Sequence, residues 1–526
     1  MARGRRLTEA RGSSALRACV LLSAALLGLR MQLSARVGFG DAEALYAAYA
    51  LFPQPGYLDH PGLIGALARV IGNGGAPSPS SAHTATAILA TAVPWVGLLA
   101  ARAAGAAREA AARTALALLL VPEIAVGLFG LTPDLPLALA WLVALGAGAL
   151  ALRSDPRSVR SLLATLVFAA AAGLATLSKV SGGLLLVGFT VAWLARSERA
   201  RLRTIAPWAA LGVFALLLVP WLAWESSQGF PLLQHRLVDS QERAGFSLRN
   251  LGALVGGQLL YVTPPFLYGA FVVGRDLWRR RDADAVSRFL WWSTLGPALP
   301  LAVLCLWSRV AEPHWLAPAY LALAVHAARA PALSRGVVRA CVGTGAAVVA
   351  LAFAWVATDW PLRLLGERYR PRYDLANDLL AWGPGGRLLD DALARATSET
   401  LRAAVVIGPH WIVCAQAQAH LGARARVGCN GKRPDDFDRW LPRQRWLEEP
   451  VLLFVHDSRF DLEPARELPD RMVTEVSRVD VRRSGRVVRT IWVTRLERLT
   501  RDALRPLDAR RPSARWRQRD EAGALQ

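Results

Sequence analysis

Residues 131–152 read LTPDLPLALAWLVALGAGALAL, a run whose only ionisable residue, Asp134, stands near its start. About 20 apolar residues let a helix cross the roughly 30 Å hydrocarbon core of a bilayer. The stretch therefore predicts a membrane-spanning helix over 135–152. Similar runs recur from residue 15 to residue 357, and 53% of the 526 residues are hydrophobic while only 19% are charged. The first two-thirds of the chain is expected to be a mainly α-helical, polytopic membrane domain.

The alternation of basic and arginine-poor loops predicts how the chain crosses the membrane. Cytoplasmic loops carry the Lys/Arg excess, so the N-terminus, with its RGRR, is expected inside and everything after residue 358 outside. The first span is expected to be an uncleaved anchor, because no clean cleavage site precedes Val37. The sequence predicts eleven spans, at roughly 14–34, 84–104, 114–131, 135–152, 161–177, 180–195, 205–224, 251–273, 289–307, 316–330 and 337–357.

Charge and cysteine usage exclude several functions. The net charge of +22 would favour a nucleic-acid partner in a soluble protein, but most arginines here flank apolar spans, so no nucleic acid is expected. Only Lys179 and Lys432 are lysines among the 62 basic residues, which makes a lysine in an apolar stretch unusual. No Cys-x-x-Cys pair, HExxH or Walker-type motif is present, so neither a metal nor a cofactor is expected.

Three domains are predicted. Residues 1–357 form the membrane domain, with a large first outer loop over 36–83. Residues 358–498 read as a small extracytoplasmic α/β domain, with strands in LRAAVVIG, VLLFVHD and VVRTIWVTRL and a helix in WIVCAQAQAHLG. Residues 499–526 are arginine-rich and are expected to be a disordered tail. In an oxidising compartment Cys414 and Cys429 are candidates for a disulfide.

Ionisable residues gather on the predicted outer side. Ionisable groups at membrane depth cost about 2.5–3.5 kcal/mol on insertion scales, so they indicate function by default. Their gathering on one face predicts a catalytic or transport cavity. The residues are Asp41, Glu43, Asp59, His60, Asp134, Lys179, Glu312 and His314.

Several of these residues have a structural alternative. Asp41 and Asp134 are each placed to cap the start of a helix. Lys179 could be a snorkelling side chain that reaches the membrane interface. His314, beside Trp315, could belong to an aromatic belt.

The first outer loop leaves two further points open. Its GYLDHPG stretch, residues 56–62, has the composition of an ordinary turn. Glu43 lies two positions from Asp41, so in a regular helix the two carboxylates do not share a face. They converge only if Asp41 lies in the loop before the helix.

Five ordered blocks resemble a known family. GYLDHPGLIG resembles the GY-x-DHPP stretch of the bacterial dolichyl-phosphate-mannose-protein mannosyltransferase-like proteins, which include the aminoarabinose transferases. LTPDLPLALAW and GLATLSKVSGGLLL resemble the family's TPD-x-P-L and G-L-A-x-L-S-K segments. FSLRNLGALVGGQLL and EPHWLAPAYLA resemble two later blocks, so the likeness covers roughly residues 36–325.

Three positions depart from the family pattern. The family has adjacent acids followed by aromatics, as in DEAYYW, whereas this chain separates Asp41 from Glu43, so which one carries the role stays open. The second Pro of DHPP is Gly62 here, and the Asn of EPNW is His314. These changes are consistent with a distinct substrate branch.

The resemblance implies a C-type glycosyltransferase fold. It also implies that the enzyme transfers a sugar, with inversion, from a polyprenyl-phosphate donor to a lipid, glycan or protein acceptor. The expected location of this reaction is the outer face of a bacterial inner membrane. Lys179 is the first candidate to hold the donor phosphate, and Arg249 the second. A carboxylate at 41 or 43 suits the general base that a hydroxyl acceptor needs. Asp59 and His60 would line the rim of the cavity.

Two other classes of protein remain as alternatives. A transporter or lipid flippase would also place ionisable groups in a membrane cavity, but repeated halves and broken helices at midplane depth are not evident. The other alternative is a membrane anchor that presents the α/β domain as a binding module. The unusual polar residues lie in the membrane domain, which favours the enzyme.

Overall fold

The computed structural model describes residues 2–241, 244–308, 312–383, 405–431, 434–460 and 473–497. The chain divides into two compact units. The first comprises Met1–Met31, Pro55–Ile64 and Thr84–Phe353; the second comprises Gln32–Gln54, Gly65–His83 and Ala354–Gln526. Most of the loop predicted over 36–83 therefore belongs to the second unit and only its GYLDHPG part to the first.

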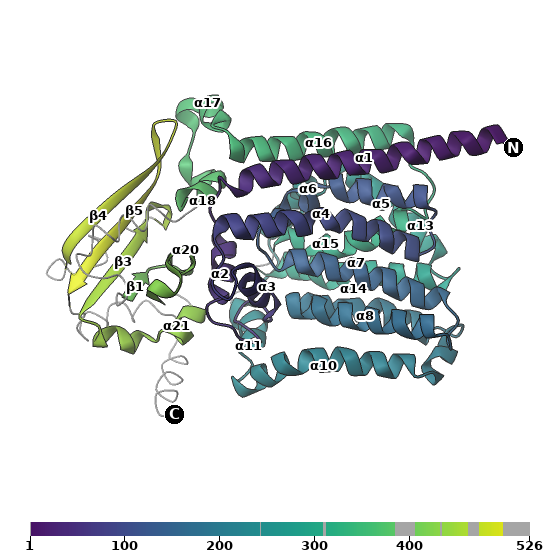
Figure 1. Ribbon diagram of the computed structural model, residues 1–526, viewed down its shortest axis with the longest axis horizontal. Coiled ribbons are helices and arrows are strands. Elements are labelled where there is room, and N and C mark those ends of the chain that lie inside the picture. Colours follow the sequence, from purple (N-terminus) through teal and green to yellow (C-terminus); the bar gives the residue numbers. More distant parts are fainter. Residues whose placement is uncertain are drawn as a thin grey trace. The chain divides into compact units, whose positions relative to one another are not determined.

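The first unit is a set of long helices that run roughly parallel to one another (Figure 1). Its helices are α1 (Ala2–Ser34), α4 (Pro79–Ala103), α5 (Arg108–Leu120), α6 (Pro122–Ala125), α7 (Asp134–Arg153), α8 (Val159–Ser178), α9 (Leu185–Leu194), α10 (Ala206–Ser227), α11 (Pro231–Leu237), α12 (Leu248–Tyr261), α13 (Pro264–Arg280), α14 (Ala285–Trp307), α15 (Ala317–Ala327) and α16 (Arg335–Ala357). The ends of α1, α4 and α16 extend into the segments of the second unit.

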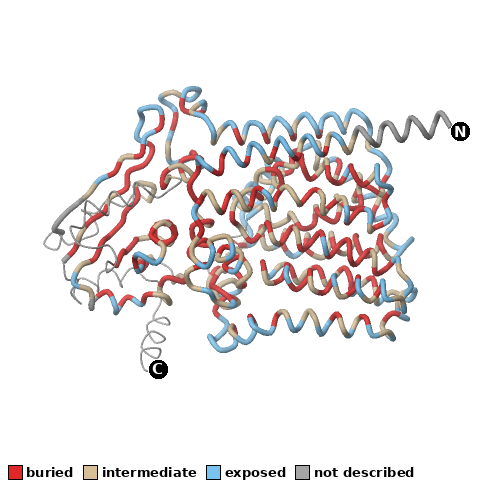
Figure 2. Tube along the Cα trace, in the orientation of Figure 1, coloured by how far each residue is buried: buried red, intermediate tan, exposed pale blue. Residues whose placement is uncertain are grey.

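Seven helices in the described part of the chain are long and apolar enough to cross a membrane, and α5 with α6 makes an eighth if the bent pair is one span. The protein is therefore a multi-pass membrane protein, although the predicted number of eleven spans is not confirmed. Helices α7 and α8 are largely buried along their length, whereas α10 and α16 expose many positions (Figure 2). The exposed apolar side chains of α10 and α16 are available to lipid.

Two predicted spans are broken by proline. The prediction of a single helix over 251–273 is wrong, because α12 ends before Thr263 and α13 begins at Pro264. Thr263 has a φ of 74°, which a helix cannot contain, and Pro264 lacks the N–H that would continue it. The segment 114–131 bends by 70° between α5 and α6, at Pro122.

Two other predicted spans are short. The segment 180–195 is a 3-10 turn over Val180–Leu184 followed by α9, and 316–330 contains α15, which has 11 residues. Lys179 is the residue at which α8 ends, so it lies in the short connection between the predicted spans 161–177 and 180–195.

The core of the first unit lies where α7, α8, α9 and α14 meet. Phe168 and Phe189 stack with ring centroids 4.0 Å apart, and Phe289 meets Phe189 edge-on at 5.6 Å. Trp141 is fully buried in the same cluster. A glycine lets α9 and α14 approach each other closely, because a Cβ at Gly188 of α9 would lie 2.2 Å from the Ser293 Oγ of α14.

The second unit contains a five-stranded sheet of order β2-β1-β3-β5-β4. Strands β2, β1 and β3 are parallel, and β5 runs antiparallel to both β3 and β4. Its elements are α2 (Asp41–Tyr49), α3 (Leu63–Ile71), α17 (Trp360–Leu365), α18 (Ala376–Ala381), β1 (Val405–Gly408), α20 (Trp411–Leu421), β2 (Arg426–Cys429), α21 (Asp436–Trp440), β3 (Val451–Asp457), β4 (Val473–Arg483) and β5 (Arg486–Glu497).

The α/β character predicted for the C-terminal region is confirmed. Strands β1, β3 and β5 and helix α20 occupy the predicted segments, whereas β2 and β4 were not predicted. Cys414 and Cys429 are both buried free thiols, and burial raises the pKa of each. The tail predicted over 499–526 lies outside the described residues.

Close packing of α9 against α14 makes a testable prediction. Gly188→Ala places a methyl group against Ser293 and the Phe289 carbonyl, and should lower the free energy of unfolding by roughly 1–3 kcal/mol. Gly212→Ala on α10 is the matched control, because nothing lies within 4 Å of its Cβ position. That control should gain about 0.5–1 kcal/mol from helix propensity. Thermal unfolding of both variants in detergent measures the difference, and equal stability would contradict the packing.

Candidate functional site

Lys179 and Asp134 form an ion pair at two adjoining helix ends. Lys179 terminates α8 and Asp134 is the first residue of α7, and Lys179 Nζ lies 2.8 Å from Asp134 Oδ1. Ser178 Oγ donates to the Pro133 carbonyl at 2.6 Å, which fastens the same two ends together. Asp134 does not cap its helix, since Pro133 occupies the N-cap position. Lys179 is therefore held by a partner rather than extended freely to the interface.

His314 joins this pair from a third helix end. It lies in the 3-10 turn Pro313–Leu316, with Nε2 3.7 Å from Asp134 Oδ2 and Nδ1 3.1 Å from Glu312 Oε2. The hydrogen bond from His314 holds the pKa of Glu312 below its ordinary value. Four residues predicted from sequence thus meet in one cluster.

Helix α12 holds the His314 turn in place. Gln258 Nε2 donates to the Pro313 carbonyl at 2.9 Å, and Tyr320 Oη donates to Gln258 Oε1 at 2.8 Å. The turn cannot shift without breaking these bonds. The ring of Trp315 lies 5.3 Å from Lys179 Nζ, which adds a cation–π contact to the cluster.

The GYLDHPG stretch is a stiff turn, as the sequence predicts. Tyr57 N donates to the His60 carbonyl at 2.9 Å, and Gly62 N donates to the Pro55 carbonyl at 2.8 Å. A Cβ at Gly56 would lie 2.7 Å from the Trp224 ring, so only glycine fits there. The turn fixes the directions of Asp59 and His60.

Arg236 is the partner of Asp59. Its Nη2 lies 2.8 Å from Asp59 Oδ1 and 3.2 Å from the Asp59 carbonyl, and His235 Nε2 lies 3.6 Å from the same carboxylate. Burial opposes ionisation of Asp59, but the charges of Arg236 and His235 keep its pKa below the ordinary value.

The buried Glu225 positions Arg236. Its carboxylate accepts from Leu232 N at 3.3 Å and Leu233 N at 3.4 Å, at the start of α11. A negative charge is favourable at a helix N-terminus. Helix α11 then presents His235 and Arg236 in its last turn.

His60 is buried and neutral. Burial lowers its pKa to about 3, with further lowering by the charges of Arg236 and Lys179. The charges of Lys179 and Asp134 also act on the His60 imidazole. The turn and the three helix ends all belong to the first unit.

Two members of this site were not predicted from the sequence, and one predicted residue stands apart from it. Arg236 and His235 lie in the 225–250 loop, whose mixed charge matched neither set of loops. Arg249 is exposed in the first turn of α12, and the structure describes no ion pair or side-chain hydrogen bond for it. Glu123 was not predicted either, although an acid within an apolar segment is the same kind of signal as Lys179.

The two remaining acids lie in the second unit. Asp41 is the first residue of α2, after the N-cap Gly40, and its two oxygens lie 2.8 and 2.6 Å from Arg459 Nη1. Glu43 is buried and accepts from Gly40 N at 2.8 Å, and His83 Nε2 lies 3.0 Å from its other oxygen. Both acids lie in the helix and have different partners, which agrees with the expectation that they do not share a face.

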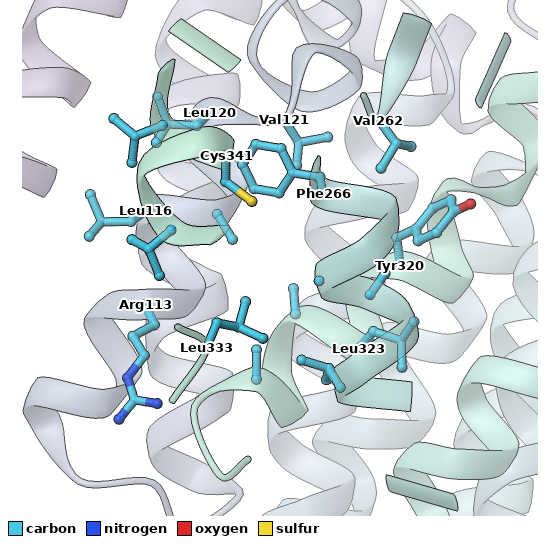
Figure 3. A pocket seen from close by; sticks show the side chains of 18 of the residues that line it. Arg113, Leu116, Leu120, Val121, Val262, Phe266, Tyr320, Leu323, Leu333 and Cys341 are labelled. Carbon is cyan, nitrogen blue, oxygen red and sulfur yellow. The ribbon is translucent and has the colours of Figure 1, made fainter. Parts of the chain in front are cut away.

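The first unit also contains an apolar pocket of about 360 Å³. Figure 3 shows its wall of leucine, valine and phenylalanine side chains, with Arg113 and Tyr320 among the few polar residues. The wall comes from α5, α13, α15 and α16 and includes Val121, which precedes the bend at Pro122. Such a space suits a hydrocarbon chain. Among the described residues, no group of three or more His, Cys, Asp or Glu is arranged to hold a metal ion.

Comparison with known proteins agrees with this architecture. The family model described as dolichyl-phosphate-mannose-protein mannosyltransferase matches residues 75–224. No curated protein matches the sequence significantly. The crystal structure of ArnT from Cupriavidus metallidurans in the apo state is similar over 91% of this chain and 98% of that chain, with a TM-score of 0.60 and 20% identity.

A second crystal structure of ArnT from Cupriavidus metallidurans, bound to undecaprenyl phosphate, is similar over 90% of this chain and 97% of that chain, with a TM-score of 0.59 and 19% identity. At this identity the likeness shows the fold alone. The chain therefore shares the fold of these ArnT structures, and its residues 75–224 match the family model described as dolichyl-phosphate-mannose-protein mannosyltransferase.

Proposed function

We propose that the protein is an inverting enzyme that moves a sugar from a polyprenyl-phosphate donor to a lipid, glycan or protein acceptor on the outer face of the inner membrane. The observation that carries the proposal is the meeting of Lys179, Asp134 and His314 at three helix ends. A cation is held at the end of apolar spans, where a lipid phosphate would lie. The apolar pocket in the same unit supports a substrate with a hydrocarbon part.

Lys179 is proposed to hold the donor phosphate. An ammonium group has three donors, and Asp134 accepts one of them in this structure. The others can serve phosphate oxygens as negative charge develops on the leaving group. Asp134 would keep the ammonium aimed at the phosphate and supply its counter-charge before the donor arrives.

Arg236 replaces Arg249 as the proposed second cation. Asp59 accepts from it through both its side chain and its main chain, so the guanidinium is oriented and its remaining N–H groups are available. Neutral His60 would contribute a hydrogen bond without adding charge. Asp59 and His60 are thus proposed to act on the donor side, as part of the rim of the cavity.

The reaction forms a bond between the acceptor oxygen and the anomeric carbon and breaks the bond from that carbon to the phosphate oxygen. The electron pair leaves with the polyprenyl phosphate, and the acceptor proton goes to a carboxylate, proposed as Asp41 or Glu43. Attack opposite the leaving group inverts the anomeric centre. A phosphate acceptor is already ionised and would need no base.

Lys179 gives the sharpest test of donor binding. Lys179→Ala should reduce the affinity for undecaprenyl phosphate at least tenfold and abolish transfer, and Lys179→Arg should be intermediate because a guanidinium differs in shape and reach. Binding is measured with purified protein in lipid nanodiscs.

Replacing Lys179 also removes the nearest partner of Asp134. The sequence alone does not reveal this ion pair. The variant is therefore expected to be less stable, since breaking a partly buried ion pair is destabilising. Lys179→Ala with Asp134→Asn is the control that removes both charges. Undiminished affinity for undecaprenyl phosphate in this double variant would refute the phosphate role.

The acids are tested by near-isosteric substitution. Asp41→Asn and Glu43→Gln should both remain folded, and at least one should reduce transfer by about 10²-fold or more, because a general base contributes roughly that much. Binding of undecaprenyl phosphate should persist in both variants, which separates base loss from donor loss. Full transfer to a hydroxyl acceptor in both variants would rule out these carboxylates as the base.

The buried His60 predicts a pH dependence of stability. Its pKa of about 3 lies below the ordinary value near 6.5, so protonation favours the unfolded chain. The stabilisation is complete above pH 6.5 and is lost as the pH falls towards 3. Between pH 7.5 and 5 the wild type should lose on the order of 1–2 kcal/mol relative to His60→Asn, measured by thermal unfolding. A constant difference across this range would contradict a buried neutral imidazole.

A further inference from the structure

The apolar pocket of the first unit adjoins a second cavity, which is polar. This polar cavity has a volume of about 280 Å³ and lies between the last turns of α13 and the segment that follows α15. Pro331, Ala332 and Leu333 line both spaces, so the two are neighbours across one short stretch of chain. An apolar space with a polar space beside it matches the form of an amphiphilic molecule.

Helix α16 closes the end of the apolar pocket that lies away from the polar cavity. A Cβ at Gly345 would lie 2.4 Å from the Leu120 carbonyl oxygen and 3.1 Å from the Phe266 ring, so α16 approaches α5 and α13 closely there. Val342, one turn earlier in α16, lines the pocket. Figure 3 shows Leu120 at one end of the pocket and Arg113 at the other. The end near Arg113 is therefore the one that continues towards the polar cavity.

Three arginines stand around this end without a carboxylate partner among the described residues. Arg275 and Arg279 line the polar cavity, one turn apart on α13, and both are exposed. Arg113 lines the apolar pocket, and its Nη1 donates to the Ala330 carbonyl at 3.4 Å. Like charges four residues apart on a helix repel each other. An anion between Arg275 and Arg279 would remove that repulsion.

Asp276 is the acidic residue that lines the polar cavity, and its two oxygens are already engaged. Oδ1 lies 3.0 Å from Arg280 Nε, and Oδ2 lies 2.9 Å from His326 Nε2. The carboxylate therefore does not neutralise the two arginines beside it. The polar cavity is a site for an anion.

Helix α15 separates the polar cavity from the polar site. The His314 turn directly precedes α15, whereas Pro331–Leu333 lie after its end. The 11 residues of α15 span about 16 Å. A phosphate that contacts Lys179 therefore does not reach the arginines of the cavity. The donor of the proposed function also has a hydrocarbon chain, but the position of these arginines favours a different lipid for this pocket.

We propose that the two spaces together bind an anionic glycerophospholipid from the leaflet that the sequence predicts to be cytoplasmic. Its phosphate would lie near Arg275 and Arg279, and one acyl chain would lie in the apolar pocket. Basic pockets between helices on this side of a membrane bind acidic head groups. A chain that runs along α5 from Arg113 to Leu120 covers about 10 Å, which fits within the roughly 15 Å of hydrocarbon that one leaflet contributes. The proposal goes beyond the proposed function, because this lipid is not the sugar donor.

The experiment measures lipid binding to the purified, delipidated full-length protein by native mass spectrometry. The probes are phosphatidylglycerol and phosphatidylcholine with the same acyl chains, and undecaprenyl phosphate. The charge variant combines Arg275→Gln with Arg279→Gln, and the pocket variant is Ala270→Phe, which fills the apolar space from α13. The control variant combines Arg157→Gln with Arg203→Gln, and so removes two exposed arginines from the connections between α7 and α8 and between α9 and α10.

Wild type and the control variant should bind phosphatidylglycerol about tenfold or more tightly than phosphatidylcholine, because each arginine near a head group adds to the attraction. The charge variant should lose this preference and bind phosphatidylcholine within about twofold of wild type. The pocket variant should bind both phospholipids more weakly, because an acyl chain loses its space. Undecaprenyl phosphate should bind every variant within about twofold of wild type.

Each of four results would overturn the proposal. Wild type shows no preference for phosphatidylglycerol; the control variant loses the preference as the charge variant does, which would mean a general surface attraction; the folded pocket variant binds phospholipid as wild type does; or the charge or pocket variant loses undecaprenyl phosphate, which would assign the pocket to the donor. The charge variant changes exposed side chains alone, so it tests the head-group site even if Ala270→Phe does not fold. Failure of the proposed function looks different, because Lys179→Ala would then bind undecaprenyl phosphate as wild type does, whatever the phospholipid result.

Discussion

The ion pair between Lys179 and Asp134 is the interaction on which the polar site depends. Each charge stands at the end of an apolar helix, where an isolated ion would be costly, and each makes the other tolerable. The pair joins the end of α8 to the start of α7, and His314 adds the turn before α15. Asp134 therefore contacts both of the other chain segments and holds the three together.

Irregular backbone around this point provides the polar surface that regular helices cannot. Proline breaks α5 from α6 and α12 from α13, and the Gly56–Gly62 turn brings a buried imidazole to the site. Each irregularity has its own partner: Arg30 for the carbonyls at the first break, and Glu225 for the N–H groups at the start of α11. Non-helical backbone is tolerated in a membrane protein when its polar groups are satisfied in this way.

The second unit binds its two acids in contrasting ways. Asp41 faces a guanidinium from the segment after β3, whereas Glu43 shares a buried position with His83 at the start of α4. The arginine binds Asp41 through charge-assisted hydrogen bonds to both of its oxygens. Glu43 instead has an imidazole nitrogen 3.0 Å from one oxygen and a backbone N–H on the other. This contrast gives a physical reason to distinguish the two candidates, which the sequence alignment to the family leaves open.

Hydropathy and local chemistry in the sequence determined that the chain crosses a membrane repeatedly, that it ends in an α/β unit, and that Lys179, Asp134, His314 and His60 belong to a polar face. These features depend on residues close together in sequence, such as an apolar run, an Asp after a Pro, or a Gly-Pro turn. Pro122 and Pro264 are local signals of the two helix breaks. The apolar composition around them nevertheless favoured the prediction of continuous spans.

Only the tertiary structure decided the partners. Lys179 meets Asp134 across 45 positions, Arg236 meets Asp59 across 177, and Arg459 meets Asp41 across 418. Charge alone does not single out these arginines, because most of the 62 basic residues of this chain are arginines with the same chemistry. Which guanidinium meets which carboxylate is decided by how helices and strands distant in sequence pack together, and no local pattern records that.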